Sequence, residues 1–186
     1  MRLTLLFLIL ISYTTASTQH QEAMTDTVSS DHSAHTSEHH HMIQISLGHT
    51  HISAGIDSDG DRKWLILPSW GLNYNYHINE QWQLGVHTDM IIEEFEVENT
   101  RITSERSRPF ALALMGGYKT RSPFTFLVGG GVEFEKEENL EFLRFAVEPA
   151  WHFGEGNWEV SAILEYDVKF ENYNSWILGI GIARLF

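Results

Sequence analysis

A chain of 186 residues supports one folded domain, and the complete absence of cysteine excludes disulfide frameworks, thiolate metal sites and cysteine nucleophiles. The formal net charge of −13 argues against nucleic-acid binding, because phosphate recognition requires clustered lysine and arginine. Cations are better matched partners, and any metal ligands must be histidine, aspartate or glutamate.

The N-terminal segment has the layout of a secretory signal peptide. A basic start is followed by an apolar run over residues 3–13 and by small residues near Ala16. We predict a signal peptide over residues 1–16, with a retained membrane anchor as the alternative. Residues 17–41 are polar and poor in aromatic side chains, which predicts a disordered, histidine-rich segment. No later stretch has the roughly 20 consecutive apolar residues of a transmembrane helix.

From residue 43 onward, apolar and polar residues alternate in blocks of about ten, the period of a β-strand. Each block has one apolar face; Trp82, Leu84 and Val86, for example, alternate with Gln83 and His87. Bulges are expected at the two prolines inside blocks, because proline removes a ladder donor. The eight predicted strands are residues 43–52, 64–78, 81–92, 108–119, 124–135, 141–153, 158–170 and 175–186.

The connections indicate how the strands are arranged. Short turns follow the second, fourth and sixth strands, whereas residues 53–63 and 94–107 form longer, charged loops. Outer-membrane barrels combine short periplasmic turns with longer external loops and carry aromatic girdles at both interfaces. Residues 42–186 are therefore predicted to form an all-β, eight-stranded antiparallel up-and-down transmembrane barrel with a periplasmic N-terminus. A soluble β-sandwich or lipocalin-like barrel, with the apolar face inward, is the competing fold.

The last eight residues, Gly-Ile-Gly-Ile-Ala-Arg-Leu-Phe, resemble the signal read by the barrel assembly machinery, with Gly181 and Phe186 at its key positions and a departure at Arg184. From about residue 43 to the end, the chain resembles the small eight-stranded outer-membrane barrels of Gram-negative bacteria. The resemblance implies an outer-membrane location, with lipid, lipopolysaccharide and the assembly machinery as partners. The chain also resembles barrels typical of Bacteroidota in its layout, with a histidine-rich tract between the signal peptide and the first strand. This resemblance implies a fold but no activity.

Eight of the 11 histidines lie at or before His51. Neutral imidazoles are good ligands for zinc, nickel and copper, and a flexible tract can wrap one ion with several of them. The fold requires no cofactor, and a solvated spacer is the alternative interpretation of the tract. The predicted ligands of a Zn, Ni or Cu ion are His35, Glu38, His39, His40, His41, His49 and His51.

A barrel of eight strands is too narrow for an open channel, so its inward side chains must fill it. We expect His87, Glu148 and Glu165 at a similar height along the barrel axis. Because buried charges persist only in pairs, we also expect ion pairs of Arg144 with both glutamates and of Lys169 with Asp167. A polar core that holds the barrel in register is the main interpretation, and a cation site or a gated pore is the alternative. The predicted lumen network is His87, Asp89, Arg144, Glu148, Glu165, Asp167 and Lys169.

The first predicted external loop contains a possible calcium-binding motif. Asp57, Asp59 and Asp61 surround a glycine as in calcium loops, but the later bidentate glutamate is missing, so an ordinary acidic turn is the alternative. Residues 94–107 are predicted to be a solvated loop. No nucleophile, phosphate-loop or zinc-protease motif occurs, so we predict no enzyme. The predicted function is a barrel whose tail binds or senses divalent transition metal; a structural or adhesive barrel and a narrow cation pore are the alternatives.

Overall fold

The computed structural model describes residues 40–186 except 57–58, 100–101, 137 and 171–172. The predicted signal peptide and most of the histidine-rich segment lie outside these residues. Within them, no helix has the length and apolar character needed to cross a membrane. The strands are β1 (His41–Ile56), β2 (Arg62–His77), β3 (Trp82–Ile91), β4 (Glu94–Asn99), β5 (Ile102–Ser107), β6 (Phe110–Lys119), β7 (Phe124–Phe134), β8 (Leu140–Phe153), β9 (Trp158–Lys169) and β10 (Asn174–Leu185).

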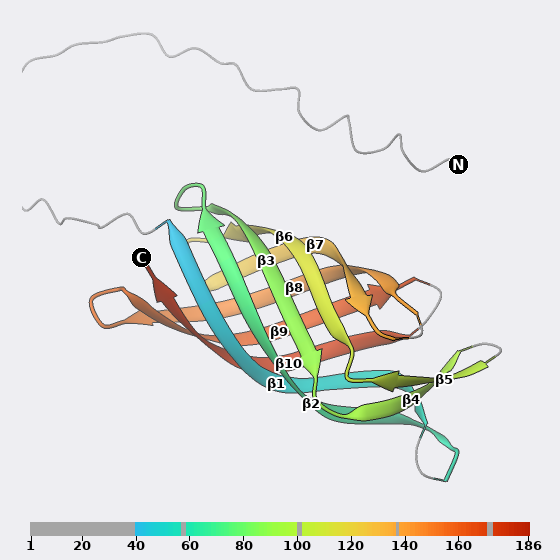
Figure 1. Ribbon diagram of the computed structural model, residues 1–186. Helices are drawn as coiled ribbons and strands as arrows, with labels where there is room; N and C mark the ends of the chain where they lie inside the picture. Colours follow the sequence, from blue (N-terminus) through green and yellow to red (C-terminus); the bar gives the residue numbers. More distant parts are fainter. Residues whose placement is uncertain (1–39, 57–58, 100–101, 137, 171–172) are drawn as a thin grey trace, which may run out of the picture. The chain divides into compact units, whose positions relative to one another are not determined.

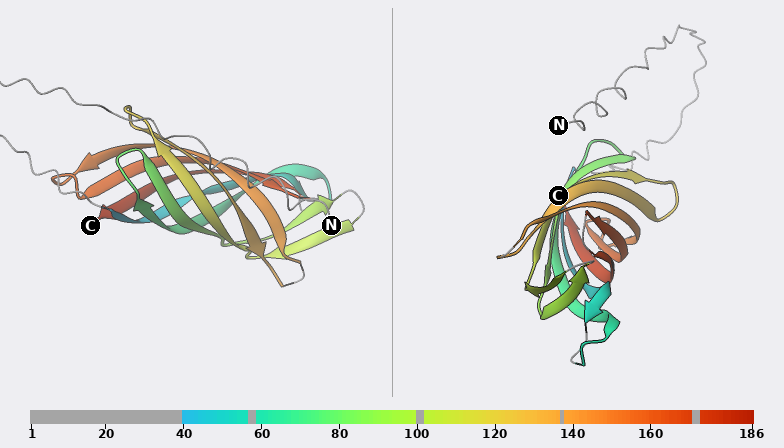
Figure 2. Two further views of the ribbon diagram at one scale, coloured as in Figure 1. Left: turned by 90° about the horizontal axis from the view of Figure 1, so that it is seen from above. Right: turned by 90° about the vertical axis from the view of Figure 1, so that its right-hand side faces the viewer.

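Eight of the strands close into the predicted antiparallel barrel. Their order is β1-β2-β3-β6-β7-β8-β9-β10, and β10 pairs with β1 from Ser175↔Ile52 to Leu185↔Met42. Figure 1 shows the C-terminus at one end of this barrel and the β4–β5 hairpin at the other. We call these the termini end and the hairpin end. The two further views in Figure 2 show the strands strongly tilted around the barrel.

The β4–β5 hairpin replaces the solvated loop that the sequence predicted over residues 94–107. Its strands pair along their whole length, and β4 continues the sheet beyond β1 through Gly55↔Val97 and Ile56↔Glu96. Accordingly, β1 and β2 run further than predicted, into the loop between them. The prediction failed because the many carboxylates of this segment obscured its alternation of glutamate with apolar Phe95 and Val97.

The bulges predicted at the two prolines are absent. Pro68 pairs with His49 without a register shift, and it lies where the β2–β3 ladder ends, so its missing donor interrupts nothing. The β8–β9 ladder skips Glu148 and Pro149 and resumes at Ala150↔Ser161 in the same register. The register shift in β1–β2 lies instead between Ile52 and Gly55.

Large apolar side chains cover the outside of the barrel. Leu114, Ile180 and Leu47 are 71%, 65% and 62% exposed, whereas the adjacent positions on the same strands are buried or half-buried. The inward-facing apolar face of the competing soluble fold is therefore excluded. Aromatic residues form the predicted girdle at the termini end and a second one at the hairpin end. The exposed members are Tyr76, Trp82, Tyr118, Phe124 and Phe153 at the first, and Trp64, Phe110, Phe134, Phe170 and Trp176 at the second.

Candidate functional site in the barrel lumen

The lumen has one wall of small or apolar residues and another of polar residues. Strands β6 and β7 contribute Ala111, Ala113, Met115 and Leu127, which leave space for long side chains from the facing strands. Polar side chains enter mostly from β1, β2, β3, β8 and β9, with Thr125 and Glu133 from β7, and are almost completely buried. Apart from Glu133 of β7, the buried charged side chains of the barrel strands therefore come from β3, β8 and β9.

Arg144 of β8 organises the charged centre. Its Nε and Nη2 atoms donate to Asp167 Oδ1 and Oδ2 at 2.7 and 2.8 Å, and its Nη1 atom contacts Asp89 and lies 3.2 Å from Glu165 Oε2. Asp89 lies on β3 and Asp167 on β9, which are opposite each other in the eight-strand order. The guanidinium group therefore bridges opposite walls of the barrel.

These contacts confirm the predicted Arg144–Glu165 pair and correct the other predicted pairs. Among the described residues no ion pair joins Glu148 to Arg144, and the Glu148 carboxylate instead accepts from Gln44 Nε2 at 3.5 Å. Asp167 faces Arg144 directly in the β8–β9 register and is occupied by it. Lys169 instead lies 3.3 Å from Glu133 Oε2 and donates to Ser175 Oγ at 2.8 Å.

A second charged group joins the barrel to the hairpin. Arg106 of β5 is fully buried and its Nη2 atom donates to Glu133 Oε1 at 2.6 Å, while the Tyr173 hydroxyl donates to the same oxygen at 2.8 Å. Burial opposes the charge of Arg106, but the hydrogen bond and charge of Glu133 outweigh it and raise the pKa of Arg106. Burial, together with the charge of Glu133, raises the pKa of Tyr173 well above its ordinary value.

An apolar cluster closes the barrel at its hairpin end. Phe95 and Val97 of β4 are at most 5% exposed and pack against inward side chains from the ends of the barrel strands. Sequence analysis missed this cap, although the period-two pattern of residues 94–97 was a usable signal. The members of the cluster are Ile52, Leu67, Ile91, Phe95, Val97, Leu140 and Tyr173.

Closer to the termini end, His87, Glu148 and Glu165 form a compact buried group. One ligand atom from each side chain lies within 4.8 Å of the other two. Their predicted common height is therefore confirmed. In the part of the chain that the structure describes, this is the one group of three or more histidine and carboxylate side chains with metal-binding spacing.

The predicted metal ligands that the structure describes do not come together in one place. His35, Glu38 and His39 lie outside the described residues. His40 and His41 lie at the termini end, where His41 Nδ1 is 2.7 Å from the Tyr74 hydroxyl. His49 and His51 follow on the outer face of β1. Eight residues of strand separate His41 from His49, about 26 Å, so one ion cannot contact both.

The predicted calcium loop lies in the β1–β2 turn, and the predicted assembly signal lies at the end of β10. Asp57 lies outside the described residues, and Asp59 and Asp61 are exposed in the β1–β2 turn. Gly181 faces the lumen, where an added Cβ would lie 2.9 Å from polar atoms of two neighbouring side chains. Phe186 is exposed at the rim and stacks on the His41 ring at a centroid distance of 5.6 Å. None of these positions tests calcium binding or assembly.

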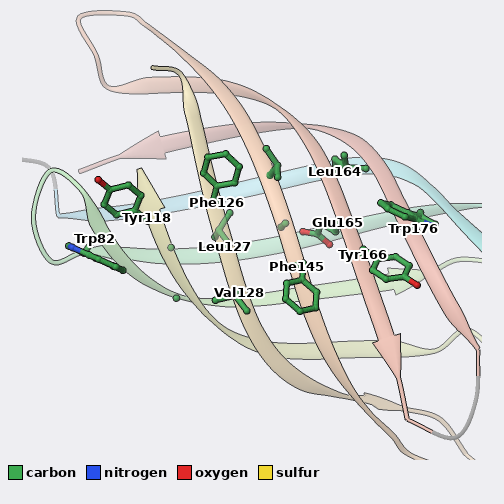
Figure 3. Close-up of a pocket in the computed structure, with 14 residues that line it drawn as sticks. Trp82, Tyr118, Phe126, Leu127, Val128, Phe145, Leu164, Glu165, Tyr166 and Trp176 are labelled. Atoms are coloured by element: carbon green, nitrogen blue, oxygen red, sulfur yellow. The ribbon is translucent and has the colours of Figure 1, made fainter. Parts of the chain in front are cut away.

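A hollow on the outer face lies over β3 and β6–β10, where Gly116 contributes no side chain (Figure 3). Its wall is almost entirely apolar, with Trp82, Tyr118, Phe126 and Phe145 around it. It is part of the apolar outer surface, and its lining suits a hydrocarbon chain rather than a polar ligand.

No family model and no curated protein matches the chain by sequence. Solved structures do match the barrel. Neisserial surface protein A shares 14% identity, with 78% of this chain and 97% of that chain covered, at a TM-score of 0.54. The fold is that of a small outer-membrane barrel. The attachment invasion locus protein Ail of Yersinia pestis, solved with the heparin analogue sucrose octasulfate, shares 17% identity over 78% of this chain and 99% of its own, at a TM-score of 0.50.

Proposed function

We propose that this protein is a non-enzymatic outer-membrane barrel with a closed lumen, whose N-terminal histidine tract binds divalent transition metal on the periplasmic side. The apolar outer face carries the proposal for the membrane. Exposed Leu, Ile, Val and aromatic side chains occur on all eight barrel strands. Burial of apolar area is favourable by about 25 cal/mol per Å², so a lipid environment is strongly preferred for this face.

Two features support a lumen that does not conduct. Arg144 of β8 contacts Asp167 on the neighbouring strand β9 and Asp89 on β3 across the lumen, which places a bound guanidinium across the middle of the barrel. The β4–β5 hairpin adds the apolar cap and the buried Arg106–Glu133 pair at the hairpin end. A narrow cation pore would require both barriers to move.

The metal-binding part of the proposal is supported by the chemistry of the tract and by the histidines at the termini end. His35, Glu38 and His39 immediately precede the barrel. The backbone N–H of His77 donates to the His40 carbonyl at 2.7 Å, which adds a further histidine at the rim where the tract ends and the barrel begins. Imidazole-rich sites of this kind select Zn²⁺, Ni²⁺ and Cu²⁺.

Zinc titration of the full-length barrel in detergent tests this proposal. We expect binding in the micromolar range or tighter, weakened at least tenfold when His35, His39 and His40 are all changed to glutamine. The matched control is the His49→Gln/His51→Gln double variant, which removes two histidines from the outer face of β1. Equal affinity together with an equal number of bound zinc ions in the tract variant and the wild type would support the alternative, a structural or adhesive barrel with the tract as a spacer.

The likeness to Ail does not favour a polyanionic ligand here. Sulfated sugars are bound by clustered cationic side chains. In this chain the hairpin end exposes Glu93, Glu94, Glu96 and Glu105, and the net charge is −13. An adhesive role, if tested, should therefore be tested with cationic rather than sulfated ligands.

A further inference from the structure

The group formed by His87, Glu148 and Glu165 joins opposite sides of the barrel. His87 is on β3, whereas the glutamates are on the neighbouring strands β8 and β9. All three side chains are at most 4% exposed. A ligand held between them would contact three strands at once, at a point well inside the lumen.

Each side chain of the group presents an atom that accepts or donates no hydrogen bond. These atoms are His87 Nδ1, Glu148 Oε1 and Glu165 Oε2. Glu165 Oε2 lies 3.2 Å from Arg144 Nη1, so it has an ion-pair contact but no hydrogen bond. The large majority of buried side-chain polar atoms have a hydrogen-bond partner in folded proteins. Three such atoms on one compact group indicate a missing partner at this place.

The orientation of His87 suits a metal ligand. Its Nε2 atom lies 3.0 Å from Asn75 Oδ1, an oxygen that can only accept, so Nε2 carries the proton. Nδ1 then keeps a lone pair that no hydrogen bond uses. This is the arrangement of metal-bound histidines, in which the second ring nitrogen donates to a fixed oxygen that orients the ring.

The charges of the mid-lumen favour a bound cation. Asp89, Glu148, Glu165 and Asp167 are all buried or nearly so, and Arg144 is the guanidinium that faces them. The next cation along the lumen, Lys169, contacts Glu133. When these four carboxyl groups are ionised, the one guanidinium leaves an excess of negative charge in a poorly solvated space, which a bound cation would neutralise.

We propose that His87, Glu148 and Glu165 form a divalent-metal site inside the barrel. The ligands are His87 Nδ1 and one oxygen from each glutamate. One nitrogen and two oxygens fit Zn²⁺, with a fourth position for water, and the nitrogen disfavours Mg²⁺ and Ca²⁺, which prefer oxygen ligands alone. The ion balances the carboxylates and ties β3 to β8 and β9. The site uses none of the tract histidines, so it stands independently of the proposed function.

Zinc analysis of the full-length protein, refolded in detergent with Zn²⁺ present and then desalted, tests the proposal. The background for the experiment is the His35→Gln/His39→Gln/His40→Gln variant, which removes the tract site. We expect about one zinc per barrel in this background and less than a tenth of that after Glu148→Gln or Glu165→Gln. The matched control is Glu159→Gln, which neutralises another buried lumen carboxylate outside the group and should keep the zinc.

The outcomes separate this site from the tract. Zinc that disappears entirely with the tract substitutions would overturn the lumen site and support the proposed function. Zinc retained in both glutamate variants would also overturn it. If a lumen variant fails to fold, the cobalt(II) spectrum of the tract-substituted barrel decides. Strong visible absorption from low-coordinate cobalt is expected, and the weak spectrum of hydrated cobalt would contradict the proposal.

Discussion

Replacement of Arg144 by methionine should destabilise the barrel more than any surface substitution. The change keeps most of the side-chain volume but removes two hydrogen bonds to Asp167 and ionic contacts to Asp89 and Glu165. Breaking a buried pair by removing one partner costs about 3–5 kcal/mol, because the remaining charges stay buried without compensation. The unfolding equilibrium constant should therefore rise by about two to four powers of ten.

Urea unfolding of the protein in lipid vesicles, followed by tryptophan fluorescence, measures this change. Arg121→Met is the matched control, since Arg121 is exposed in the β6–β7 turn, and it should shift the free energy by less than about 0.5 kcal/mol. Combining Arg144→Met with Asp167→Asn should cost less than the sum of the single changes, because the asparagine leaves one charge fewer unpaired. A folded Arg144→Met barrel as stable as the control would refute the account of the lumen.

Three further predictions address the packing and the cap. Gly131→Ala should lower the free energy of unfolding by about 1–3 kcal/mol, because the new Cβ would lie 2.2 Å from the Leu112 carbonyl oxygen. The control is Gly130→Ala on the outer face, where the nearest atom to the new Cβ is 3.4 Å away. This control should be nearly neutral in the same urea assay. Phe95→Ala should cost about 3–5 kcal/mol and speed proteolysis of the hairpin, measured by limited digestion. Because the pKa of Tyr173 is raised in the folded state, the contribution of this hydroxyl to stability should be constant below pH 10 and fall as the pH rises further. Tyr173→Phe should remove this fall and the last component of the 295 nm absorbance titration, and an unchanged titration would contradict the burial of this hydroxyl.

The barrel was predictable because it follows from local alternation. A strand with one face in lipid and one in the lumen repeats every two residues, and this pattern distinguished Leu114 from Ala113 and Trp70 from Ser69 without tertiary information. The common height of His87, Glu148 and Glu165 followed from counting residues from the short turns. Both predictions depend on distances along one strand or between neighbouring strands.

The partners within the lumen were not predictable in the same way. Lys169 contacts Glu133 rather than Asp167 because contacts across the lumen depend on strand stagger and tilt, which alternation does not determine. The role of Arg106 was missed for a related reason. A charged residue in an acidic segment is usually solvated, and only the pairing of β4 with β1 brings this hairpin over the barrel mouth.

The most direct test of the account is the electrophoretic mobility of the full-length protein in detergent, with and without boiling, after separation of cell membranes. The account predicts that the protein sediments with the outer membrane and that the unboiled sample migrates as a compact band which boiling shifts. A protein that stays in the soluble fraction and has the same mobility in both samples would contradict the closed, lipid-facing barrel.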